Sequence, residues 1–511
     1  MSVNLFAAIH IGSYELTMKI CEYSKKNGIK QIEYIRHGFE MNFDHYSDEK
    51  LRIEDIDVVC NVLKNFKRIM DGYHVTEYRA YATSAMRESR NVILILEQIR
   101  VKTGLNVVAL TNSEHRLLNY KAFVNNMEDV YDEKDNYAGL LDIDGNNMQI
   151  SIFDGACLKT TQKLRLGLFK IKEKVWKYRP KLKELEEMVD ELFSDQLENI
   201  KKLHMNNGKM KKLIITDDYF SHLFVTERLK KEGVPIDEFT TYMQGLNDRN
   251  LEAFTEKYNL NKETLVLFCL LLLVIKKITK VFRIEVIMNP RITVCDGIAY
   301  EYAYDNKYLK DYHDFESDIL SATRYLNEKY MVDIASVEDE KNSASLIFKA
   351  MKKVHGLDNR AGFLLSIAAL LHETGKYINI SNVGESSYDI VMQTELIGLS
   401  HIERKIIANV CKYNYMEFGY SEEILKDRSI DIPAYLVIAK LTAILRISSA
   451  IHKSNKQKYR DIKVVVKDNE LIITVDTDYT LMIESGMILE RKQFFEEVFG
   501  ITVVFKEKRK K

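Results

Sequence analysis

The chain has 511 residues, of which 46% are hydrophobic and 29% are charged. This length corresponds to three or four domains of roughly 100–200 residues, and the composition is that of a globular protein. The net charge of −1 excludes a protein that coats nucleic acid, so we expect no nucleic-acid partner. Six cysteines without CxxC spacing indicate reduced thiols and a cytoplasmic location.

The most apolar stretch is Leu265–Ile275 (LVLFCLLLLVI). It is much shorter than the ~20 residues that a membrane-spanning helix needs, so it predicts a buried helix and no membrane partner. The N-terminus lacks a basic region followed by an apolar one, and we therefore expect no secretory signal. Because only four prolines and no low-complexity linker occur, the domains are expected to pack closely.

The chain begins with a predicted β-hairpin. Phe6–Ile9 is apolar, His10–Tyr14 contains the glycine and serine of a tight turn, and Glu15–Ile20 resembles a second strand. Further along, Ile53–Asp71 carries apolar residues at three- and four-residue spacing, which predicts an amphipathic helix. Val75–Ala82 then predicts another strand.

Two charged residues follow strand ends in the next part of the chain. Arg87 lies in Thr83–Asn91, where a Thr-Ser pair is suited to cap the helix that runs to Lys102. Its guanidinium group could bind a phosphate through two hydrogen bonds, although a solvent-exposed helix residue is the alternative. Glu114 begins a further helix, a position that the helix dipole favours even without catalysis.

The segment Asp142–Gln149 (DIDGNNMQ) lies between the apolar run Tyr137–Leu141 and the run Ile150–Phe153. Strand, polar turn and strand are the predicted structure. Backbone N–H groups in such a turn can face an anion while the carboxylate of Asp142 holds a cation. An ordinary hairpin with a polar tip is the alternative. Two glycine hairpins, each opening an α/β half, are typical of the actin-like fold, in which two ribonuclease-H-like domains hold a phosphate chain between their turns.

Several segments, in order along the whole chain, resemble the exopolyphosphatase/guanosine pentaphosphate phosphatase (Ppx/GppA) family in its long form. The segments are AAIHIGS (7–13), ATSAMRESRN (82–91), SEHRLL (113–118), DIDGN (142–146), LRLG (164–167), MNPRITVCDGIAYE (288–301), LLSIAALLHETGKYINI (364–380), QTELIGLSHIERKIIANV (393–410) and AILRISSAIHKS (443–454). The resemblance implies an α/β chain. Two ribonuclease-H-like domains (1–125 and 126–304) precede an α-helical HD-like domain (305–432) and a small C-terminal α+β module (433–511).

The resemblance implies a hydrolase that releases terminal phosphate from inorganic polyphosphate or guanosine pentaphosphate with Mg²⁺, or Mn²⁺, as the cofactor. By position, Gly12 and Ser13 match the first phosphate-binding turn and Arg87 matches the phosphate-contacting arginine. Gly145 and Asn146 lie in the second phosphate-binding turn.

The catalytic and metal positions also follow from the resemblance. Asp142 matches the metal-side aspartate, and Gln149 stands at a second metal or water position. Glu114 matches the glutamate that activates water as general base, provided that the preceding turn is one residue shorter. Without that gap, His115 would take the catalytic place.

Four positions depart from the family pattern. His10 stands where the first turn begins with Asp, and Gln149 replaces a glutamate, so two carboxylates are lost. Asp144 adds negative charge where a phosphate would approach, and Asn146 adds a side chain where the family has none. The departures predict a weakened hydrolase, and a catalytically inactive binding or regulatory protein of the same fold is the alternative.

The C-terminal half resembles an HD-type helical domain with an incomplete set of metal ligands. His372–Glu373 stands in the His-Asp place, whereas Ser386–Ser387 and Asn414 occupy positions where histidines are expected. One histidine and one carboxylate make a poor metal site, so we expect His372 to be structural. This region would extend the phosphate-binding path or form a homodimer.

Overall fold

The computed structural model describes residues 4–13, 15–26, 28–39, 50–126, 137–143, 145, 147–155, 157–164, 166–176, 178, 181–206, 208–217, 229, 233–245, 262–309, 313–453, 458–459 and 461–508. The chain divides into two compact units, which we call unit 1 (Met1–Phe315) and unit 2 (Glu316–Lys511). The predicted four-domain division stays a prediction.

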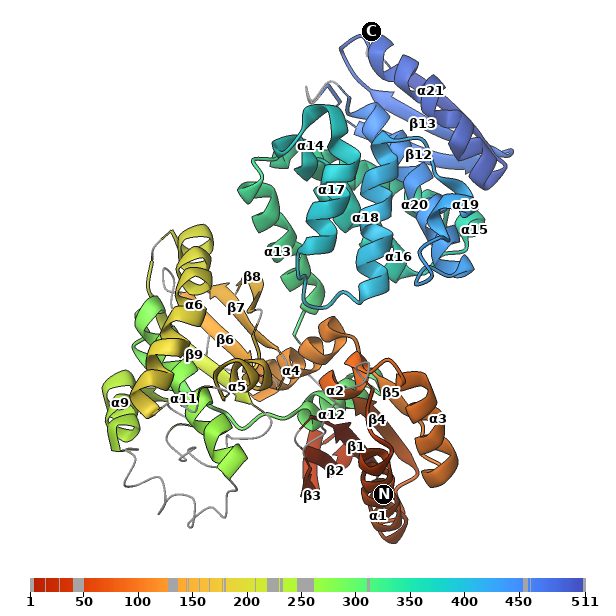
Figure 1. The fold of residues 1–511 in the computed structure, drawn as a ribbon. Coiled ribbons are helices and arrows are strands. Elements are labelled where there is room, and N and C mark those ends of the chain that lie inside the picture. The colour runs from red at the N-terminus through yellow and green to blue at the C-terminus, as the bar shows by residue number, and fades with distance from the viewer. Residues whose placement is uncertain are drawn as a thin grey trace. The chain divides into compact units, whose positions relative to one another are not determined.

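The first sheet of unit 1 contains β1 (Asn4–Ile11), β2 (Glu15–Ser24), β3 (Gly28–Gly38), β4 (Glu77–Ala82) and β5 (Val107–Ala109). Their order across the sheet is β3-β2-β1-β4-β5. The strand β1 is antiparallel to β2 and parallel to β4, so it lies at the centre (Figure 1). The predicted N-terminal hairpin and the strand that ends at Ala82 are confirmed.

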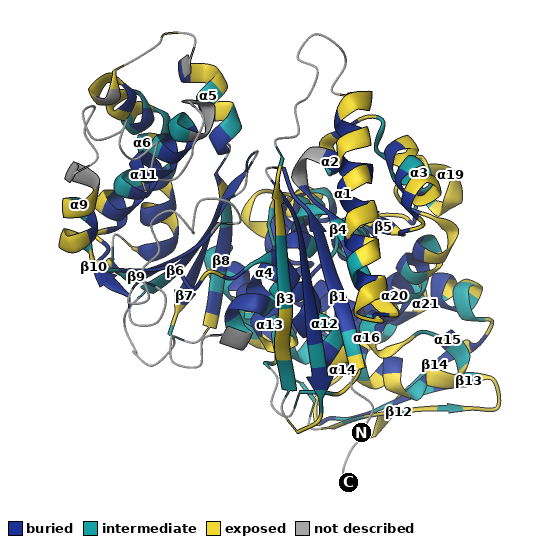
Figure 2. Ribbon diagram, turned by 90° about the horizontal axis from the view of Figure 1, so that it is seen from below, coloured by how far each residue is buried: buried dark blue, intermediate teal, exposed yellow. Residues whose placement is uncertain are grey.

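Four helices accompany this sheet in the sequence: α1 (Ile53–Gly72), α2 (Ser84–Glu88), α3 (Val92–Thr103) and α4 (Asn112–Asn126). The helix α1 buries Ile56, Val59, Leu63 and Phe66, which recur every three or four residues as its sequence predicted. Its opposite face is exposed and forms the yellow stripe along α1 in Figure 2. The apolar stripe therefore fixes which side of α1 packs on the sheet.

The second sheet repeats the strand order of the first. It contains β6 (Tyr137–Ile143), β7 (Met148–Asp154), β8 (Cys157–Leu164), β9 (Met210–Asp217), β10 (Val234–Pro235) and β11 (Val286–Met288), in the order β10-β11-β9-β6-β7-β8. The strand β6 is antiparallel to β7 and parallel to β9, as β1 is to β2 and β4. This duplication agrees with the predicted actin-like fold.

The helices α5 (Leu168–Trp176), α6 (Leu182–Met205), α9 (Ile236–Gly245) and α11 (Lys262–Phe282) belong to the second sheet's half. The helix α11 contacts both α5 and α6 and contains the apolar run Leu265–Ile275. Leu270, Leu271 and Val274 of this run are completely buried in the core. The predicted buried helix is confirmed.

The helix α12 (Val294–Asp305) returns to the first sheet's half. It packs against β1 and α4, and the thiol of Cys295 lies 3.4 Å from the carbonyl oxygen of Ala8. Gly297 allows a very close approach, because a Cβ atom there would lie 2.1 Å from the carbonyl oxygen of Leu118. The end of the predicted second domain therefore packs with the first.

Unit 2 is mainly helical. Its helices are α13 (Phe315–Lys329), α14 (Ile334–Ala350), α15 (Lys352–His355), α16 (Asn359–Leu371), η1 (Thr374–Tyr377), η2 (Ile380–Asn382), α17 (Val383–Gln393), α18 (His401–Tyr415), α19 (Tyr420–Ile424), α20 (Ile432–Ile451) and α21 (Met482–Phe499). The strands β12 (Asp461–Lys467), β13 (Glu470–Asp476) and β14 (Thr502–Lys508) form a sheet in that order.

One continuous hydrophobic core joins the helices of unit 2 to this small sheet. It includes Leu365 and Ile444 from helices and Leu471 and Val503 from strands, all buried. The helix α20 is long and apolar enough to cross a membrane by length and composition alone, and 72% of its apolar window is buried. In unit 2 it is a central core helix.

All six cysteines are free thiols. Cys21, Cys60, Cys295 and Cys411 are buried, Cys269 is partly buried and Cys157 is exposed. The absence of a disulfide among these residues agrees with the prediction from their spacing.

Candidate functional site

The first predicted phosphate turn joins β1 to β2. The N–H of Gly12 donates to the carbonyl oxygen of Glu15 at 2.9 Å, which closes the turn. Gly12 also lies against His10, because a Cβ atom at residue 12 would be 3.0 Å from Cε1 of the imidazole. Ser13 is buried, and its hydroxyl oxygen has no hydrogen-bond partner in the described part of the chain.

Two buried histidines lie beside this turn. The imidazole rings of His10, at the end of β1, and His115, in the first turn of α4, have centroids 6.0 Å apart. The Nε2 atom of His10 lies 3.0 Å from the hydroxyl oxygen of Thr83. Burial lowers the pKa of His10 to about 3, so this imidazole is uncharged at neutral pH. Burial, followed by the electrostatic effects of His10, Arg87 and Arg116, holds the pKa of His115 well below its ordinary value.

Arg87 in α2 lies where the two halves of unit 1 meet. Its Nη1 atom donates to the carbonyl oxygen of Leu110 at 3.3 Å, and Nη2 lies 3.7 Å from Oε1 of Glu88. The same Glu88 oxygen accepts a hydrogen bond from Nδ2 of Asn147, at 3.1 Å, from the β6–β7 turn. The predicted arginine is therefore linked through Glu88 to the β6–β7 turn.

Glu114 takes part in the cap of α4. One of its carboxylate oxygens, Oε2, accepts hydrogen bonds from the backbone N–H and the hydroxyl of Thr111, at 2.8 and 2.7 Å. The hydroxyl oxygen of Thr111 in turn accepts from the N–H of Glu114 at 3.3 Å. This reciprocal arrangement is a capping box. Catalysis by Glu114 stays a prediction, and the carboxylate also has this structural role.

Asp142 lies near the end of β6 and is 9% exposed. Its Oδ2 atom accepts from Nη1 of Arg116 at 2.9 Å. Its Oδ1 atom accepts from Nδ2 of Asn119 at 2.8 Å and from the hydroxyl of Thr216 at 3.2 Å. Three donors from α4 and β9 therefore surround the predicted metal-side carboxylate.

The sequence interpretation missed these three donors. Arg116 and Asn119 are three residues apart, so they lie on the same face of α4. The sequence shows this spacing. It does not show that both side chains bind Asp142, because Asp142 lies on β6, 26 and 23 residues further along the chain. Thr216 lies directly opposite Asp142 in the parallel β6–β9 pair.

The second predicted phosphate turn joins β6 to β7. The carbonyl oxygen of Gly145 accepts from the N–H of Phe169 at 2.9 Å. Gln149 lies opposite Asp142 in the β6–β7 pair, so the two side chains share one face of the sheet. Oε1 of Gln149 is buried without a hydrogen-bond partner among the described residues. Asn146 and Asp144, which the sequence also singled out, lie outside the described residues.

Magnesium prefers several oxygen ligands at about 2.0–2.1 Å in octahedral geometry. The described residues at these turns do not fit that requirement. Both oxygens of Asp142 are engaged, one of them by a positively charged guanidinium group. His10 and Gln149 stand where resemblance to the family would put carboxylates, and neither provides a charged oxygen.

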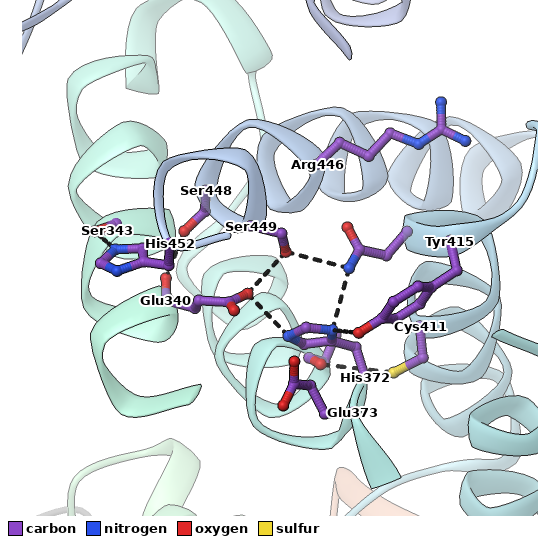
Figure 3. A network of polar contacts seen from close by, with 12 residues as sticks. Glu340, Ser343, His372, Glu373, Cys411, Tyr415, Arg446, Ser448, Ser449 and His452 are labelled. Carbon is purple, nitrogen blue, oxygen red and sulfur yellow. Dashed lines mark hydrogen bonds and ion pairs between the residues drawn. The ribbon is translucent and has the colours of Figure 1, made fainter. Parts of the chain in front are cut away.

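Unit 2 contains a second polar cluster, which surrounds the predicted His372 (Figure 3). Within the described residues, Glu340, His372 and Glu373 form the one group of three whose metal-binding atoms all lie within 4.8 Å of one another. All three side chains are buried. Glu340, on α14, was missed because a lone glutamate in a helix resembles a solvated residue.

The cluster is satisfied by internal contacts. Nε2 of His372 lies 2.9 Å from Oε2 of Glu340, which also accepts from the hydroxyl of Ser449 at 2.8 Å. Nδ1 of His372 lies 3.1 Å from Nδ2 of Asn414 and 3.2 Å from the hydroxyl of Tyr415. Nδ1 therefore lies between the amide of Asn414 and the hydroxyl of Tyr415, while Nε2 faces Glu340.

The electrostatics of Glu340 agree with this pairing. Burial acts to raise its pKa, but the attraction of His372 and the hydrogen bonds of His372 and Ser449 outweigh burial and lower it. Glu340 is therefore ionised and holds the imidazole in one orientation. This geometry is in keeping with the structural role expected for His372.

Comparisons with known proteins identify the family in both halves of the chain. The description "Ppx/GppA phosphatase family" matches residues 30–304, and "Ppx/GppA phosphatase, domain III" matches residues 320–494. No curated protein matches the chain.

The fold of this chain resembles those of solved structures whose sequences are only distantly similar. An exopolyphosphatase from Cytophaga hutchinsonii is 15% identical, with a TM-score of 0.50, over 60% of this chain and 98% of its own. A Ppx/GppA family member from Aquifex aeolicus is 14% identical, with a TM-score of 0.49, over 60% of this chain and 99% of its own. Because the family match from residue 30 to residue 304 alone covers more than half of the sequence, the chain belongs to the Ppx/GppA phosphatase family.

Proposed function

We propose that the chain binds the end of a linear phosphate chain, either inorganic polyphosphate or guanosine pentaphosphate, at the β1–β2 and β6–β7 turns. We further propose that binding, rather than fast hydrolysis, is its main function. Family membership supports the phosphate class of ligand. The weakened set of carboxylates supports the loss of hydrolysis.

One observation supports this proposal above all: several buried polar atoms at or beside the two turns have no hydrogen-bond partner among the described residues. They are Nδ1 of His10, the hydroxyl oxygen of Ser13, Nε2 of His115 and Oε1 of Gln149. Buried polar atoms are nearly always hydrogen-bonded, so such a group indicates a ligand or water. His10 and His115 are neighbours, and His115 precedes Arg116, which contacts Asp142 opposite Gln149.

The electrostatic surroundings favour an anion over a cation at this place. Arg87 and Arg116 are both close enough to lower the pKa of His115. The two imidazoles are uncharged, and each can donate one N–H. Phosphate oxygens accept hydrogen bonds from such groups and pair with guanidinium groups.

Isothermal titration of the protein with inorganic tripolyphosphate tests the binding. Arg87→Gln is expected to weaken binding about 10- to 100-fold, as expected for a charge-assisted hydrogen bond. Arg100→Gln is the matched control, because Arg100 lies exposed on α3 and pairs with Glu97. If tripolyphosphate does not bind the wild type, or binds both variants equally, the proposed site is wrong.

A second candidate function is exopolyphosphatase activity, which family membership and Glu114 favour. Phosphate release from long-chain polyphosphate, compared between wild type and Glu114→Gln, tests it. Gln is chosen because its carbonyl oxygen can still accept from Thr111 and keep the capping box. Release that disappears in Glu114→Gln would establish the hydrolase. Background release from both proteins, with binding intact, supports a binding protein.

A further inference from the structure

The contacts of Asp142 make the candidate site of this chain unlike a magnesium site. A carboxylate that ligates a metal must keep an oxygen lone pair directed at the ion. Here Oδ2 receives Arg116 at 2.9 Å, while Oδ1 receives Asn119 at 2.8 Å and Thr216 at 3.2 Å. Three of the carboxylate's four lone-pair sites are therefore engaged. A divalent ion on Oδ1 would displace a donor, and one on Oδ2 would lie beside a guanidinium group.

The charge of this pair is already balanced. Arg116 and Asp142 are both almost completely buried, with side chains 5% and 12% exposed. One positive and one negative charge give a net charge of zero. Gln149 opposite Asp142 adds no charge, and neither does the imidazole of His10 beside the first turn. Carboxylate-based magnesium sites depend on excess negative charge, which these residues do not supply.

Arg116 has donors beyond the one that it gives to Asp142. A guanidinium group has five N–H donors, and Asp142 accepts one of them, from Nη1. The helix α4 also brings His115, whose Nε2 atom is buried without a hydrogen-bond partner in the described residues. Consecutive residues of one helix thus carry a fixed cation and a buried polar atom, and the cation is close enough to lower the pKa of His115.

We propose that Arg116, oriented by Asp142, supplies the positive charge that a magnesium ion supplies in a metal-dependent phosphatase, so that the site binds phosphate chains without a metal. The inference rests on the proposed phosphate-chain site. Asp142 acts as a positioning residue for Arg116 and does not ligate a cation. Arg116 contacts the anion directly.

Titration with tripolyphosphate, in excess EDTA and in excess magnesium chloride, is the first test. We expect the dissociation constants measured in EDTA and in magnesium chloride to agree within about threefold. Binding that requires magnesium would overturn metal independence and leave the phosphate site standing. No binding in either solution would overturn the phosphate site itself.

The variant Asp142→Asn distinguishes a positioning aspartate from a metal ligand. Asp142→Asn removes a negative charge but keeps an acceptor for Arg116, so tripolyphosphate is expected to bind at least as tightly in EDTA. If Asp142 were a metal ligand, the same variant would lose magnesium-dependent binding and leave binding in EDTA unaffected. Titration of each protein with Mn²⁺ alone provides a second readout, in which the wild type is expected to show no saturable site in this unit.

Removing Arg116 tests the cation itself. Arg116→Gln alone leaves Asp142 buried without its charged partner and can prevent folding. The double variant Arg116→Gln/Asp142→Asn removes both charges and keeps hydrogen-bonding groups at both positions. It is expected to remain folded by circular dichroism and to bind tripolyphosphate at least about tenfold more weakly than Asp142→Asn. Equal binding by these two proteins would overturn the role of Arg116.

Discussion

At the end of β1, His10 and His115 place two uncharged imidazoles side by side in the interior of unit 1. Histidine in place of aspartate at residue 10 therefore does more than remove a carboxylate: because the imidazole is buried, it also leaves this position uncharged. An aspartate there would carry charge at every physiological pH, whereas His10 does not. The residue therefore fits a site whose charges are already balanced.

The lowered pKa of His10 predicts a loss of stability in mild acid. The ordinary pKa is 6.5 and the folded value is about 3, so below pH 6.5 the unfolded chain binds a proton that the folded chain does not. Between pH 7 and 5 this costs about 2 kcal/mol of unfolding free energy for one histidine. Urea denaturation across this range is expected to show a smaller loss in His10→Gln than in wild type.

His37→Gln is the control for that experiment, because His37 is exposed on β3. Its pH dependence is expected to follow wild type. If His10→Gln and wild type lost the same free energy in acid, the buried uncharged state of His10 would be contradicted.

The Glu340–His372 pair predicts a large effect from a small change in unit 2. Glu340→Gln removes the charge that faces Nε2 of His372 and is expected to cost about 3 kcal/mol of unfolding free energy, as for other broken buried pairs. Glu338→Gln on the same helix breaks only partly exposed ion pairs and is expected to cost about 0–1 kcal/mol. Similar losses in the two variants, measured by urea denaturation, would contradict a specific role for the pair.

Among the elements, α12 shows that local sequence predicts a helix or strand better than it predicts what that element packs against. Both hairpins, the helix α1 and the buried run in α11 follow from apolar spacing and turn residues, and each was predicted. The packing of α12 on β1 was not, because it depends on contacts such as Cys295 with Ala8, 287 residues apart. For the same reason, the sequence indicated Asp142 and Arg87 but not the pairing of Asp142 with Arg116.

The close contact between α12 and α4 makes Gly297 sensitive to substitution. In Gly297→Ala the new methyl group would lie 2.1 Å from the backbone oxygen of Leu118, so the helices must separate. We expect a loss of about 2–3 kcal/mol in unfolding free energy, typical of overpacking. Gly72→Ala at the end of α1 is the control, since nothing lies within 4 Å of its added Cβ. A Gly297→Ala protein as stable as this control would show that the contact is looser than described.

For the whole molecule, the two units have separate hydrophobic cores, and each core lies within its own unit. Calorimetry of the full chain is expected to resolve two transitions, of which Glu340→Gln lowers only the one that belongs to unit 2. Tripolyphosphate at about 100 times its dissociation constant should stabilise unit 1 by roughly 2.7 kcal/mol and leave the other transition unchanged. A ligand-induced shift confined to the transition that Glu340→Gln lowers would contradict the placement of the site.

The repeated strand order of unit 1 has a consequence for ancestry. His10 and Asp142 are the next-to-last residues of β1 and β6, the central strands of the two sheets, so they are one position present in two copies. A gene that arises by duplication starts with the same residue at both copies, and each copy then changes independently. The two halves have since diverged at this position: one copy is a carboxylate neutralised by an arginine, and the other an uncharged imidazole. A reconstructed ancestor that carried the same residue in both copies should therefore differ from the present chain at one of these two positions at least.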